Sequence, residues 1–493
     1  MNVLLVWPRY PDTYWSFNYA LKFISKTASN VPLGLITVAA LLPQEWNKKL
    51  IDLNDSALRD KDIQWADYVF ISAMSVQSAS VAMIIKQCKL LNAKIVAGGP
   101  LFTEEYDRYP EIDHLVLNEA EVTLPEFIED VFKGTPRKKY DTNGFADLTT
   151  SPVPDYSLLH LKSYATAGIQ YSRGCPFDCE FCDITALFGR HVRTKSTQQI
   201  ISELDQLYKL KWKGSVFFVD DNFIGHKKKL KSELLPAIIE WMQVHGNPFE
   251  FLTEASINLE DDKELMELMV KAGFTKVFVG IETPEESCLT ECNKLHNRNR
   301  DLINSIKKIQ KFGMEVYGGF IVGFDNDPSG IFQRQIDFIQ ESGIITAMVG
   351  LLNAPRLSRL YKRLDGEGRI SYQFSGDNTN GATNIIPVMN KDELIKGYNK
   401  IIRNIYSAKP YAERVIRFLK YYNPPSIRFR LSPAKIMALF KSFLYLGLLN
   451  RDLIYFWKIF FWSLLFRPRL FGLAVEYSVY GYHFKKVFRD IVY

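Results

Sequence analysis

Residues 171–184 read YSRGCPFDCEFCDI and place Cys175, Cys179 and Cys182 at spacings of four and three residues. Such a group of cysteines indicates a metal site, because thiolates select zinc, copper(I) or iron–sulfur clusters. A structural zinc site needs four ligands, and His191 is the only nearby candidate for the fourth. A four-iron cluster can instead take three thiolates and keep one iron without a protein ligand. The spacing therefore favours an iron–sulfur cluster with an open coordination position.

The other three cysteines do not continue this pattern. Cys288 and Cys292 lie four residues apart in a predicted helix, and Cys88 lies in another helix. We interpret all three as small buried side chains. Six cysteines in 493 residues, half of them within eight residues, do not form the framework of a secreted disulfide protein. We therefore expect a reducing cytoplasm, and we interpret the N-terminal MNVLLVWPRYPDTYW as a first β-strand rather than a signal peptide.

The cysteines follow the first of six predicted strands that alternate with amphipathic helices. Six strand–helix units are fewer than the eight of a closed barrel, so we predict a partial, open-sided (β/α)6 barrel. Its strands are AGIQYS (167–172), GSVFFVD (214–220), FEFLTEA (249–255), TKVFVGIE (275–282), MEVYGGFIVGF (314–324) and ITAMVGLL (345–352).

Polar residues end several of these strands, where barrel enzymes carry their chemistry. Some of them are expected to be helix caps instead, because acidic residues are common before helices. Near the cysteines, Arg173 is expected to offset thiolate charge and Phe181 to help keep the site dry. The strand-end candidates are Asp220, Asp221, Glu254, Glu282 and Asp325.

The first 145 residues show a separate alternation of apolar strands and helices, which predicts a doubly wound, Rossmann-like parallel sheet. Its strands are NVLLVW (2–7), KLIDLN (49–54), YVFISAM (68–74), KIVAGG (94–99) and HLVLNE (114–119). Ligands of such sheets bind at the carboxyl ends of the strands. The small residues at Gly98, Gly99 and Pro100 either admit a ligand close to the backbone or simply form a tight turn.

These patterns predict an α/β protein with four segments. We expect a Rossmann-like domain at 1–145, a linker at 146–165, the partial barrel at 166–370, and a helical C-terminal domain at 371–493.

The C-terminal segment carries the basic charge of the chain. Residues 411–493 hold 14 Lys and Arg against 4 Asp and Glu, and residues 426–493 hold 18 aromatic side chains. No uncharged run there exceeds nine residues, far below the ~20 that cross a bilayer. We favour a helix lying in the surface of an anionic membrane, and a buried aromatic cap with outward-pointing basic side chains is the alternative. Nucleic-acid binding is not expected, because the positive charge follows a hydrophobic tail rather than a polar groove.

The cysteine motif, with an aromatic residue before its third cysteine, resembles that of the radical S-adenosylmethionine (SAM) superfamily. The resemblance implies that Cys175, Cys179 and Cys182 hold a 4Fe-4S cluster whose open iron binds SAM, with Phe181 near the adenine. It also implies SAM contacts for strand-end residues, although DDNF at 220–223 stands where the family usually has a GGEP-like stretch. These candidates are Asp220, Asp221, Asn222, Glu254, Glu282, Gly323 and Asp325.

The whole chain is similar to B12-binding-domain radical SAM proteins of the hopanoid C-2 methylase type. The similarity rests on PDTYWSF, VPLGLITVAALLP, VFISAMSVQS, VAGGPLFT and LNEAEVTLPEF. It implies cobalamin between the two domains, near Ser72, Ala73, Gly98, Gly99, Pro100 and Glu119. The first domain lacks the Asp-x-His-x-x-Gly stretch that supplies a lower axial histidine in many cobalamin proteins, and His114 is its only histidine.

The resemblance implies an enzyme that cleaves SAM to a 5′-deoxyadenosyl radical and, with cobalamin, methylates an unactivated carbon. The cofactors supply this chemistry, and the protein supplies their geometry. The aromatic, basic tail suggests a lipid or polyprenoid substrate and attachment to the cytoplasmic face of the membrane. An electron donor such as flavodoxin or ferredoxin is implied as a partner.

Two alternatives stay open at this point. One is carbon–carbon bond or ring formation on a membrane lipid without methyl transfer. The other is an iron–sulfur electron carrier or a zinc-stabilised lipid-binding protein.

Overall fold

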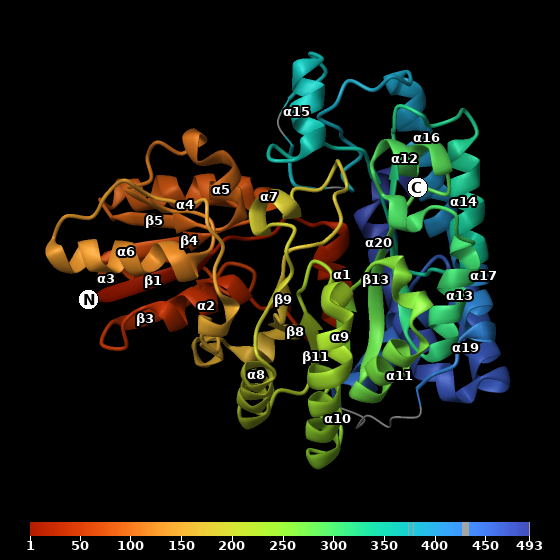
Figure 1. The fold of residues 1–493 in the computed structure, drawn as a ribbon. Helices are drawn as coiled ribbons and strands as arrows, with labels where there is room; N and C mark the ends of the chain where they lie inside the picture. The colour runs from red at the N-terminus through yellow and green to blue at the C-terminus, as the bar shows by residue number, and fades with distance from the viewer. Residues whose placement is uncertain (373, 378, 426–432, 493) are drawn as a thin grey trace.

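The computed structural model describes residues 1–372, 374–377, 379–425 and 433–492. Figure 1 shows an N-terminal α/β part beside a larger second sheet, with the C-terminal helices packed on the second sheet. Both large sheets are parallel throughout, so the predicted α/β fold with a partial barrel and a helical C-terminal part is confirmed. The predicted tail residues 426–432 and 493 lie outside the described residues.

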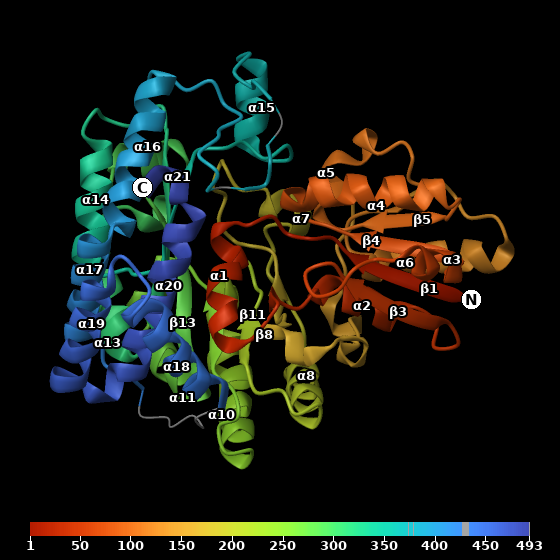
Figure 2. The same ribbon diagram turned by 180° about the vertical axis from the view of Figure 1, so that it is seen from behind.

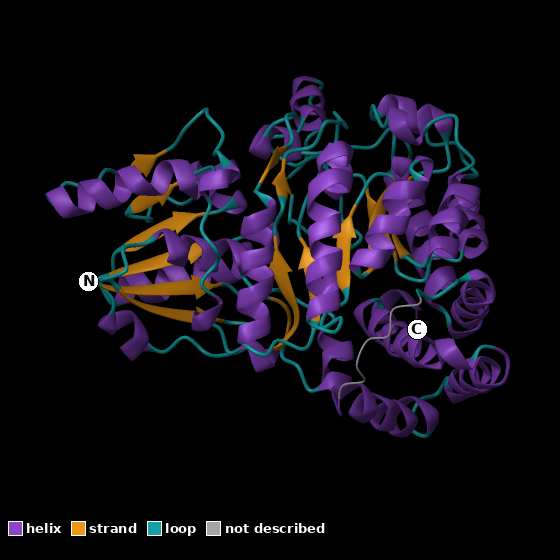
Figure 3. Ribbon diagram, turned by 60° about the horizontal axis from the view of Figure 1, so that its bottom comes forward, coloured by secondary structure: helices purple, strands orange, loops and turns teal. Residues whose placement is uncertain are grey.

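The first sheet has the strand order β3-β1-β4-β5-β6-β7. Its apolar strands are covered by helices on both faces (Figure 3), as expected for parallel strands buried on both sides. The strands are β1 (Asn2–Trp7), β3 (Asn47–Asp52), β4 (Tyr68–Ser72), β5 (Ile95–Gly98), β6 (His114–Val116) and β7 (Lys139–Tyr140). The helices are α2 (Leu33–Leu41), α3 (Asp60–Trp65), α4 (Ser78–Leu90), α5 (Pro100–Glu105) and α6 (Ala120–Lys133).

The second sheet has the order β15-β14-β13-β12-β11-β8-β2 and contains all six predicted barrel strands. Its strands from that series are β8 (Tyr164–Ile169), β11 (Ser215–Phe218), β12 (Phe251–Glu254), β13 (Phe274–Glu282), β14 (Glu315–Val322) and β15 (Ala347–Leu351). The helices are α7 (Ile184–Phe188), α8 (Thr197–Lys209), α9 (Lys227–Lys229), α10 (Leu235–Val244), α11 (Lys263–Ala272), α12 (Glu286–Glu291), α13 (Leu302–Phe312), α14 (Ile331–Ser342) and α15 (Arg359–Gly366).

The barrel helices begin and end where the sequence provides caps. The side chains of Asp262 and Asp301 accept hydrogen bonds from backbone N–H groups in the first turns of α11 and α13. Gly273 and Gly313 then end these helices with φ values of +106° and +110°, a conformation that glycine adopts without a side-chain clash. Each turn thus returns the chain to the amino end of the next strand.

A seventh strand of the second sheet comes from the N-terminal segment. β2 (Ala28–Asn30) pairs in parallel with β8, with Ala28 opposite Tyr164 and Asn30 opposite Thr166. The preceding η1 (Tyr14–Ser16), α1 (Asn18–Leu21) and η2 (Lys22–Ile24) also contact the second part of the molecule, since Tyr14 stacks on Phe484 with ring centroids 4.4 Å apart. The N-terminal segment therefore contributes to both sheets.

The C-terminal helices cover the open side of the barrel (Figure 2). They are α16 (Lys391–Tyr406), α17 (Ala408–Tyr421), α18 (Pro433–Gly447), α19 (Leu453–Phe466), α20 (Phe471–Val487) and α21 (Arg489–Val492). Among the described residues, no helix has both the length and the apolar character needed to cross a bilayer.

Helix α20 is fixed to the inner face of the barrel by buried polar contacts. Lys276 of β13 pairs with Glu476 at 2.6 Å, and the Tyr477 hydroxyl donates to Glu315 of β14 at 2.6 Å. Next along the same face of β13, Phe278 meets Trp15 of η1 with ring centroids 5.7 Å apart. The next residue of β13 that faces into the barrel is Gly280, close to the carboxyl end of the strand. Helix α20 and η1 therefore fill the interior of the barrel only below Gly280.

Candidate functional site

The three cysteines lie in the loop after β8. The chain leaves β8, forms β9 (Ser172–Arg173) against the antiparallel β10 (Arg193–Thr194), and reaches α7 after the third cysteine. Gly174 has a φ of +93°, and a Cβ atom there would lie within 3.1 Å of three carbonyl groups, those of Phe188, Gly189 and His191. Only glycine allows this close approach, so Gly174 fixes the turn that presents the cysteines at the carboxyl end of the barrel.

The thiols of Cys175, Cys179 and Cys182 are partly buried and close enough for their charges to act on one another. Burial raises the pKa of each thiol, and the charges of Cys175 and Cys179 add to this effect at Cys182, whose pKa lies well above its ordinary value. Among the described residues, no three His, Cys, Asp or Glu side chains are placed to hold a metal ion as they stand. Each thiolate of a four-iron cluster binds a different iron. The ligands are therefore spread over several irons and are not gathered around a single ion. A group of three neighbouring, partly buried thiols fits this arrangement.

Asp220 and Asp221, which follow β11, hold the backbone of the cysteine loop. Asp220 accepts hydrogen bonds from the backbone N–H groups of Tyr171 and Ser172, and Asp221 accepts one from Gly174 at 3.2 Å. Burial raises the pKa of Asp220 to about 7 and that of Asp221 to about 6. Both predicted residues thus lie at the site, where their carboxyl groups hold the backbone before Cys175 in place.

Asn222 and Glu254 also lie at this end of the barrel. The Asn222 side chain accepts a hydrogen bond from the backbone N–H of Ser256 at 3.1 Å, and it lies near the Cys175 thiol, whose pKa burial raises above its ordinary value. Glu254 ends β12 and has no hydrogen-bond or ion-pair partner in the described part of the chain. Burial, then the charges of Asp221 and Asp220, raise the pKa of Glu254 to about 8. This carboxyl group is therefore available to a cationic ligand.

Glu282 is already paired, with a residue that the sequence analysis missed. Its carboxylate forms a buried ion pair with Lys294, whose ammonium lies 5.8 Å from the ring centroid of Phe181. Burial lowers the pKa of Lys294, but the charges of Glu282 and Cys179 outweigh it and raise the pKa above its usual value. Glu282 also has a φ of +66°, which is rare for a residue with a side chain. Lys294 therefore links the end of β13 to the cysteine loop.

The residues at the end of β14 have structural partners. Gly323, with a φ of +106°, donates its N–H to Asp327 at 2.6 Å. Asp325 forms a two-pronged ion pair with Arg369, at 2.6 and 2.8 Å. Asp325 therefore attaches the segment after α15 to the barrel.

Cys292 lies close to the three cysteines of the loop. Its carbonyl accepts a hydrogen bond from the Glu180 N–H at 2.9 Å. Burial, then the charges of Glu282 and Cys179, raise the pKa of Cys292 to about 12. Cys88 and Cys288 are also buried, as the sequence analysis expected for all three.

The two α/β parts are joined beside the cysteine loop by a buried ion-pair network. Arg173 contacts Glu119 and Glu121 of the first part, both at 2.8 Å, and Arg193 contacts Glu119 at 2.9 Å. Arg173 and Glu119 therefore neutralise each other across the interface, while their predicted roles beside the cluster and the cobalamin stay predictions.

The remaining first-domain candidates lie at the carboxyl edge of their sheet, in a turn that packs on itself. Gly99 has a φ of +90°, and a Cβ atom there would lie 2.8 Å from the Ser72 hydroxyl and 3.2 Å from the Ala73 backbone. A Cβ atom on Gly98 would lie 2.5 Å from the Val116 carbonyl oxygen. Both glycines before Pro100 are thus required by the turn itself, whichever ligand lies above it.

Comparison with known proteins assigns the central segment. The family description "Radical SAM superfamily" matches residues 169–339, and "Domain of unknown function (DUF4070)" matches residues 358–493. An uncharacterized methyltransferase of Synechocystis sp. is 40% identical over 86% of this chain and 80% of its own length. The chain belongs to the radical SAM superfamily.

A second relative and a solved structure extend the comparison. The hopanoid C-2 methylase of Rhodopseudomonas palustris is 33% identical over 84% of this chain and 78% of its own length. Among solved structures, the cobalamin-dependent S-adenosylmethionine radical enzyme OxsB superposes with a TM-score of 0.61 at 14% identity, over 100% of this chain and 79% of its own. That structure shows that the two-domain fold is shared. The protein is an enzyme of a superfamily that uses a 4Fe-4S cluster and SAM, and its relatives include methyltransferases.

Proposed function

We propose that the protein methylates an unactivated carbon of a hydrophobic lipid or polyprenoid substrate, with a 4Fe-4S cluster, SAM and cobalamin as cofactors. The observation that carries the proposal is the group of three neighbouring, partly buried thiols at the carboxyl end of the barrel. At the same end, the carboxyl group of Glu254, which ends β12, has no partner among the described residues. Relationship to the hopanoid C-2 methylase, at 33% identity over most of both chains, supports the methyl transfer and the class of substrate.

When bound, the cluster and SAM supply a carbon-centred radical, and cobalamin supplies the methyl group. Cys175, Cys179 and Cys182 would hold the cluster. Glu254 and Asp221 would attract the positive charges of SAM, because opposite charges attract strongly in a partly buried site. Exclusion of water from this space by the bound cofactors and substrate would protect a reactive species from side reactions.

Phe181 and Lys294 would border the SAM site on its other side. Lys294 is held by Glu282 and lies over the Phe181 ring, which restricts the orientation of that ring. Gly280 has no side chain where a Cβ atom would lie 2.5 Å from the Lys294 ammonium nitrogen. The three residues thus form one preassembled unit next to Cys179.

Cobalamin would lie at the carboxyl edge of the first sheet, by Ser72, Ala73 and the turn at residues 98–100. Ligands of doubly wound sheets bind at that edge. His114 cannot serve as a lower ligand there, because it begins β6 at the opposite edge and its Nδ1 lies 2.6 Å from the Arg137 carbonyl oxygen. Glu119 would act on this region only indirectly, through its ion pairs with Arg173 and Arg193.

The inner face of the barrel below the cysteines is suited to an apolar substrate. Trp15 is 36% exposed and its indole lies against Phe278 and against Met348 of β15, with 3.0 Å between the indole nitrogen and the Met348 sulfur. Along the strands of the barrel, the side chains of Trp15, Phe278 and Met348 lie between the part of the interior that α20 fills and Gly280. A hydrocarbon bound on them would meet the cluster end of β13.

Helices α18 and α19 would attach the enzyme to an anionic membrane. They expose large apolar side chains that a soluble protein normally buries: Phe440 is 65% exposed and Leu465 is 72% exposed. Exposed basic side chains, including Arg451, Lys458 and Arg469, lie among them, and such a mixture suits the headgroup region of a bilayer. Figures 1 and 2 place these helices toward the end of the barrel sheet where its strands begin, away from α7 and the cysteine loop. The membrane surface would thus lie away from the cluster end of the barrel.

The test uses protein reconstituted without oxygen and supplied with SAM whose methyl group is deuterated, cobalamin, and lipids from a strain lacking the gene. We expect a lipid that carries the deuterated methyl group and depends on added cobalamin. SAM cleavage that yields a new ring or carbon–carbon bond without the label would refute methylation. The Cys179→Ala variant is the control for cluster-dependent chemistry.

A further inference from the structure

One aromatic side chain of the N-terminal segment lies across the interior of the barrel. Trp15 belongs to η1, whose other two residues, Tyr14 and Ser16, are buried. The Trp15 indole reaches two strands of the second sheet. Its ring meets Phe278 of β13 with centroids 5.7 Å apart, and its nitrogen lies 3.0 Å from the sulfur of Met348 on β15. The indole therefore spans the inner face between these strands.

The strand between β13 and β15 adds no side chain at this position. Gly319 of β14 is paired in register with Met348, and a Cβ atom on Gly319 would lie 2.8 Å from the Phe278 ring. The Phe278 ring thus covers the backbone of β14. Together, the side chains of Trp15, Phe278 and Met348 form one apolar surface across the three strands, which we call the barrel floor.

Charged side chains lie on the other side of the barrel floor. Lys276, the preceding inward residue of β13, pairs with Glu476 at 2.6 Å, and its ammonium lies 6.0 Å from the centroid of the Tyr317 ring. A hydrocarbon cannot replace the partners that such buried charges require. The barrel floor is therefore the lower limit of an apolar site that extends toward Gly280.

Trp15 is held in place by the contacts of its neighbour in η1. Tyr14 is fully buried and stacks on Phe484 with ring centroids 4.4 Å apart. The Tyr14 hydroxyl lies 3.0 Å from the hydroxyl of Tyr406, and the Tyr14 carbonyl oxygen lies 2.9 Å from Nε2 of His483. These contacts fix the backbone that carries the indole, so Trp15 forms a fixed end to the space above it.

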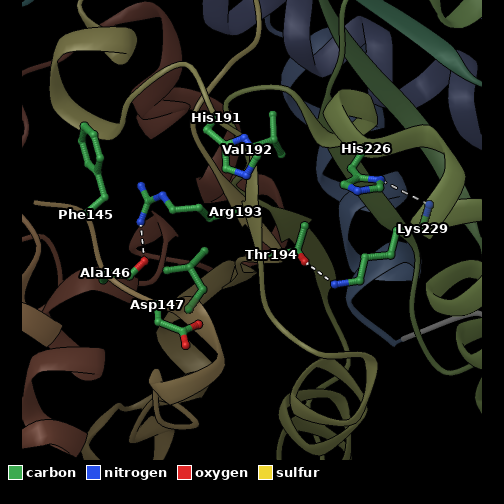
Figure 4. A pocket seen from close by; sticks show the side chains of 10 residues that line it. Phe145, Ala146, Asp147, His191, Val192, Arg193, Thr194, His226 and Lys229 are labelled. Atoms are coloured by element: carbon green, nitrogen blue, oxygen red, sulfur yellow. Dashed lines mark hydrogen bonds between the residues drawn. The ribbon is translucent and has the colours of Figure 1, made fainter.

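The hollow of about 480 Å³ beside β10 is walled off from the cysteines (Figure 4). Residues 191–194 form one of its walls. The His191 carbonyl lies against Gly174, where a Cβ atom would be 2.8 Å from its oxygen. The Lys229 ammonium of the lining already donates to the Thr194 hydroxyl at 2.9 Å. Because backbone separates this hollow from the inner side of the cysteine loop, we place the apolar substrate in the barrel interior.

We propose that Trp15 limits how deeply a hydrocarbon enters the barrel, and so selects which of its carbons lies at the cluster. This inference rests on the proposed function, because it requires an apolar substrate. Every chain that stops at the barrel floor presents to the cluster a carbon at the same distance from its buried end. Selection by depth suits a hydrocarbon, since apolar contacts are non-directional and cannot recognise one carbon by its chemistry.

The test measures the binding of linear 1-alkanols of increasing length by calorimetry. It uses the full-length protein with its cluster and SAM bound and without a reductant, so that no reaction occurs. We expect each methylene to raise the affinity about fourfold until the chain reaches the barrel floor, where the rise should stop. In Trp15→Ala the rise should continue for about four to six more methylenes, because an indole covers about 150–250 Å² and a methylene about 30 Å².

Trp15→Phe keeps an aromatic ring and should move the limit by fewer methylenes, which tests the proposal even if the alanine variant does not fold. The matched control is Trp65→Ala, which removes an indole of nearly equal exposure (37%, against 36% for Trp15) at the end of α3. Its limit should not move. An unchanged limit in both Trp15 variants, an equal shift in the control, or no alkanol binding at all would overturn the proposal. If the limit moves as expected but deuterated SAM labels no lipid, only the proposed function fails.

Discussion

Arg173 and Glu119 lie 2.8 Å apart and join the two α/β parts of the molecule two residues before Cys175. Both side chains are largely buried, and Arg173 also holds Glu121. The pair therefore couples the position of the cysteine loop to the first domain. Removing one partner would leave buried charge without compensation.

We expect Arg173→Met to lower the free energy of unfolding by about 3–5 kcal/mol, because Glu121 loses its cation and Glu119 keeps only Arg193. Urea unfolding of the cluster-free protein measures this change. Arg298→Met is the control: its pair with Glu286 at 3.1 Å is largely exposed, so its loss should cost less than about 1 kcal/mol. Equal effects of both substitutions would contradict the interpretation of the buried network.

The number of cluster ligands can be tested with two cysteine variants. Cys179→Ala should lose most of the bound iron and sulfide and all SAM cleavage, because it removes one of three thiolates. Cys292→Ser should retain both, although Cys292 lies near Cys179. Iron and sulfide analysis with visible absorption of the oxygen-free protein is the measurement. A cluster lost in Cys292→Ser would mean that four cysteines take part.

Stability of the cluster-free protein should depend on pH through three carboxyl groups at the site. Their pKa values are raised, to about 8 for Glu254, about 7 for Asp220 and about 6 for Asp221. The folded state therefore keeps protons that the unfolded chain has released, so the stability present at low pH is lost progressively from about pH 4 to about pH 8.

Glu254→Gln should make the protein more stable at pH 8 and reduce this slope most above about pH 7, where Asp220 and Asp221 have largely lost their protons and Glu254 dominates the slope. Urea unfolding at pH 5 to 8 measures both effects, and Glu111→Gln, at an exposed position of the first part, is the control. A slope unchanged by Glu254→Gln would show that Glu254 is already ionised in the folded protein.

Membrane binding can be tested by placing charges on the apolar surface of α18 and α19. Phe440→Glu with Leu465→Glu should reduce flotation with phosphatidylglycerol vesicles at least about 10-fold, because each apolar side chain contributes about 1.5–3 kcal/mol when buried. Leu90→Glu, at an equally exposed leucine (74%) on α4, should not. If the double variant instead converts a dimer to a monomer without changing flotation, the surface is an interface between copies of the chain.

Strand positions could be predicted from the sequence because their apolar runs are long. All five predicted strands of the first sheet and all six of the second are present. β2 was missed, since three residues of sequence Ala-Ser-Asn carry no strand pattern and pair only because β8 offers them an edge. The local sequence could not contain that information.

The residues of the candidate site also fall into those that the sequence could predict and those that it could not. The cysteine motif locates the loop, and Asp220, Asp221 and Glu254 follow from their positions at strand ends. Lys294 was not predicted, because a lysine after a short helix has no local signal, and its role depends on Glu282 and Phe181 approaching it in space. The ion pair between Arg173 and Glu119 likewise joins residues that are far apart in the chain.

The pairing of β2 with β8 has a consequence for how this protein can be divided. A fragment that ends after the first α/β domain would carry β2 without its partner, and a fragment that begins at the barrel would expose the backbone edge of β8, which invites aggregation. During synthesis, β2 also leaves the ribosome long before β8 exists to receive it. Expression of either half alone is therefore expected to fail for topological reasons, even where its own hydrophobic core is complete.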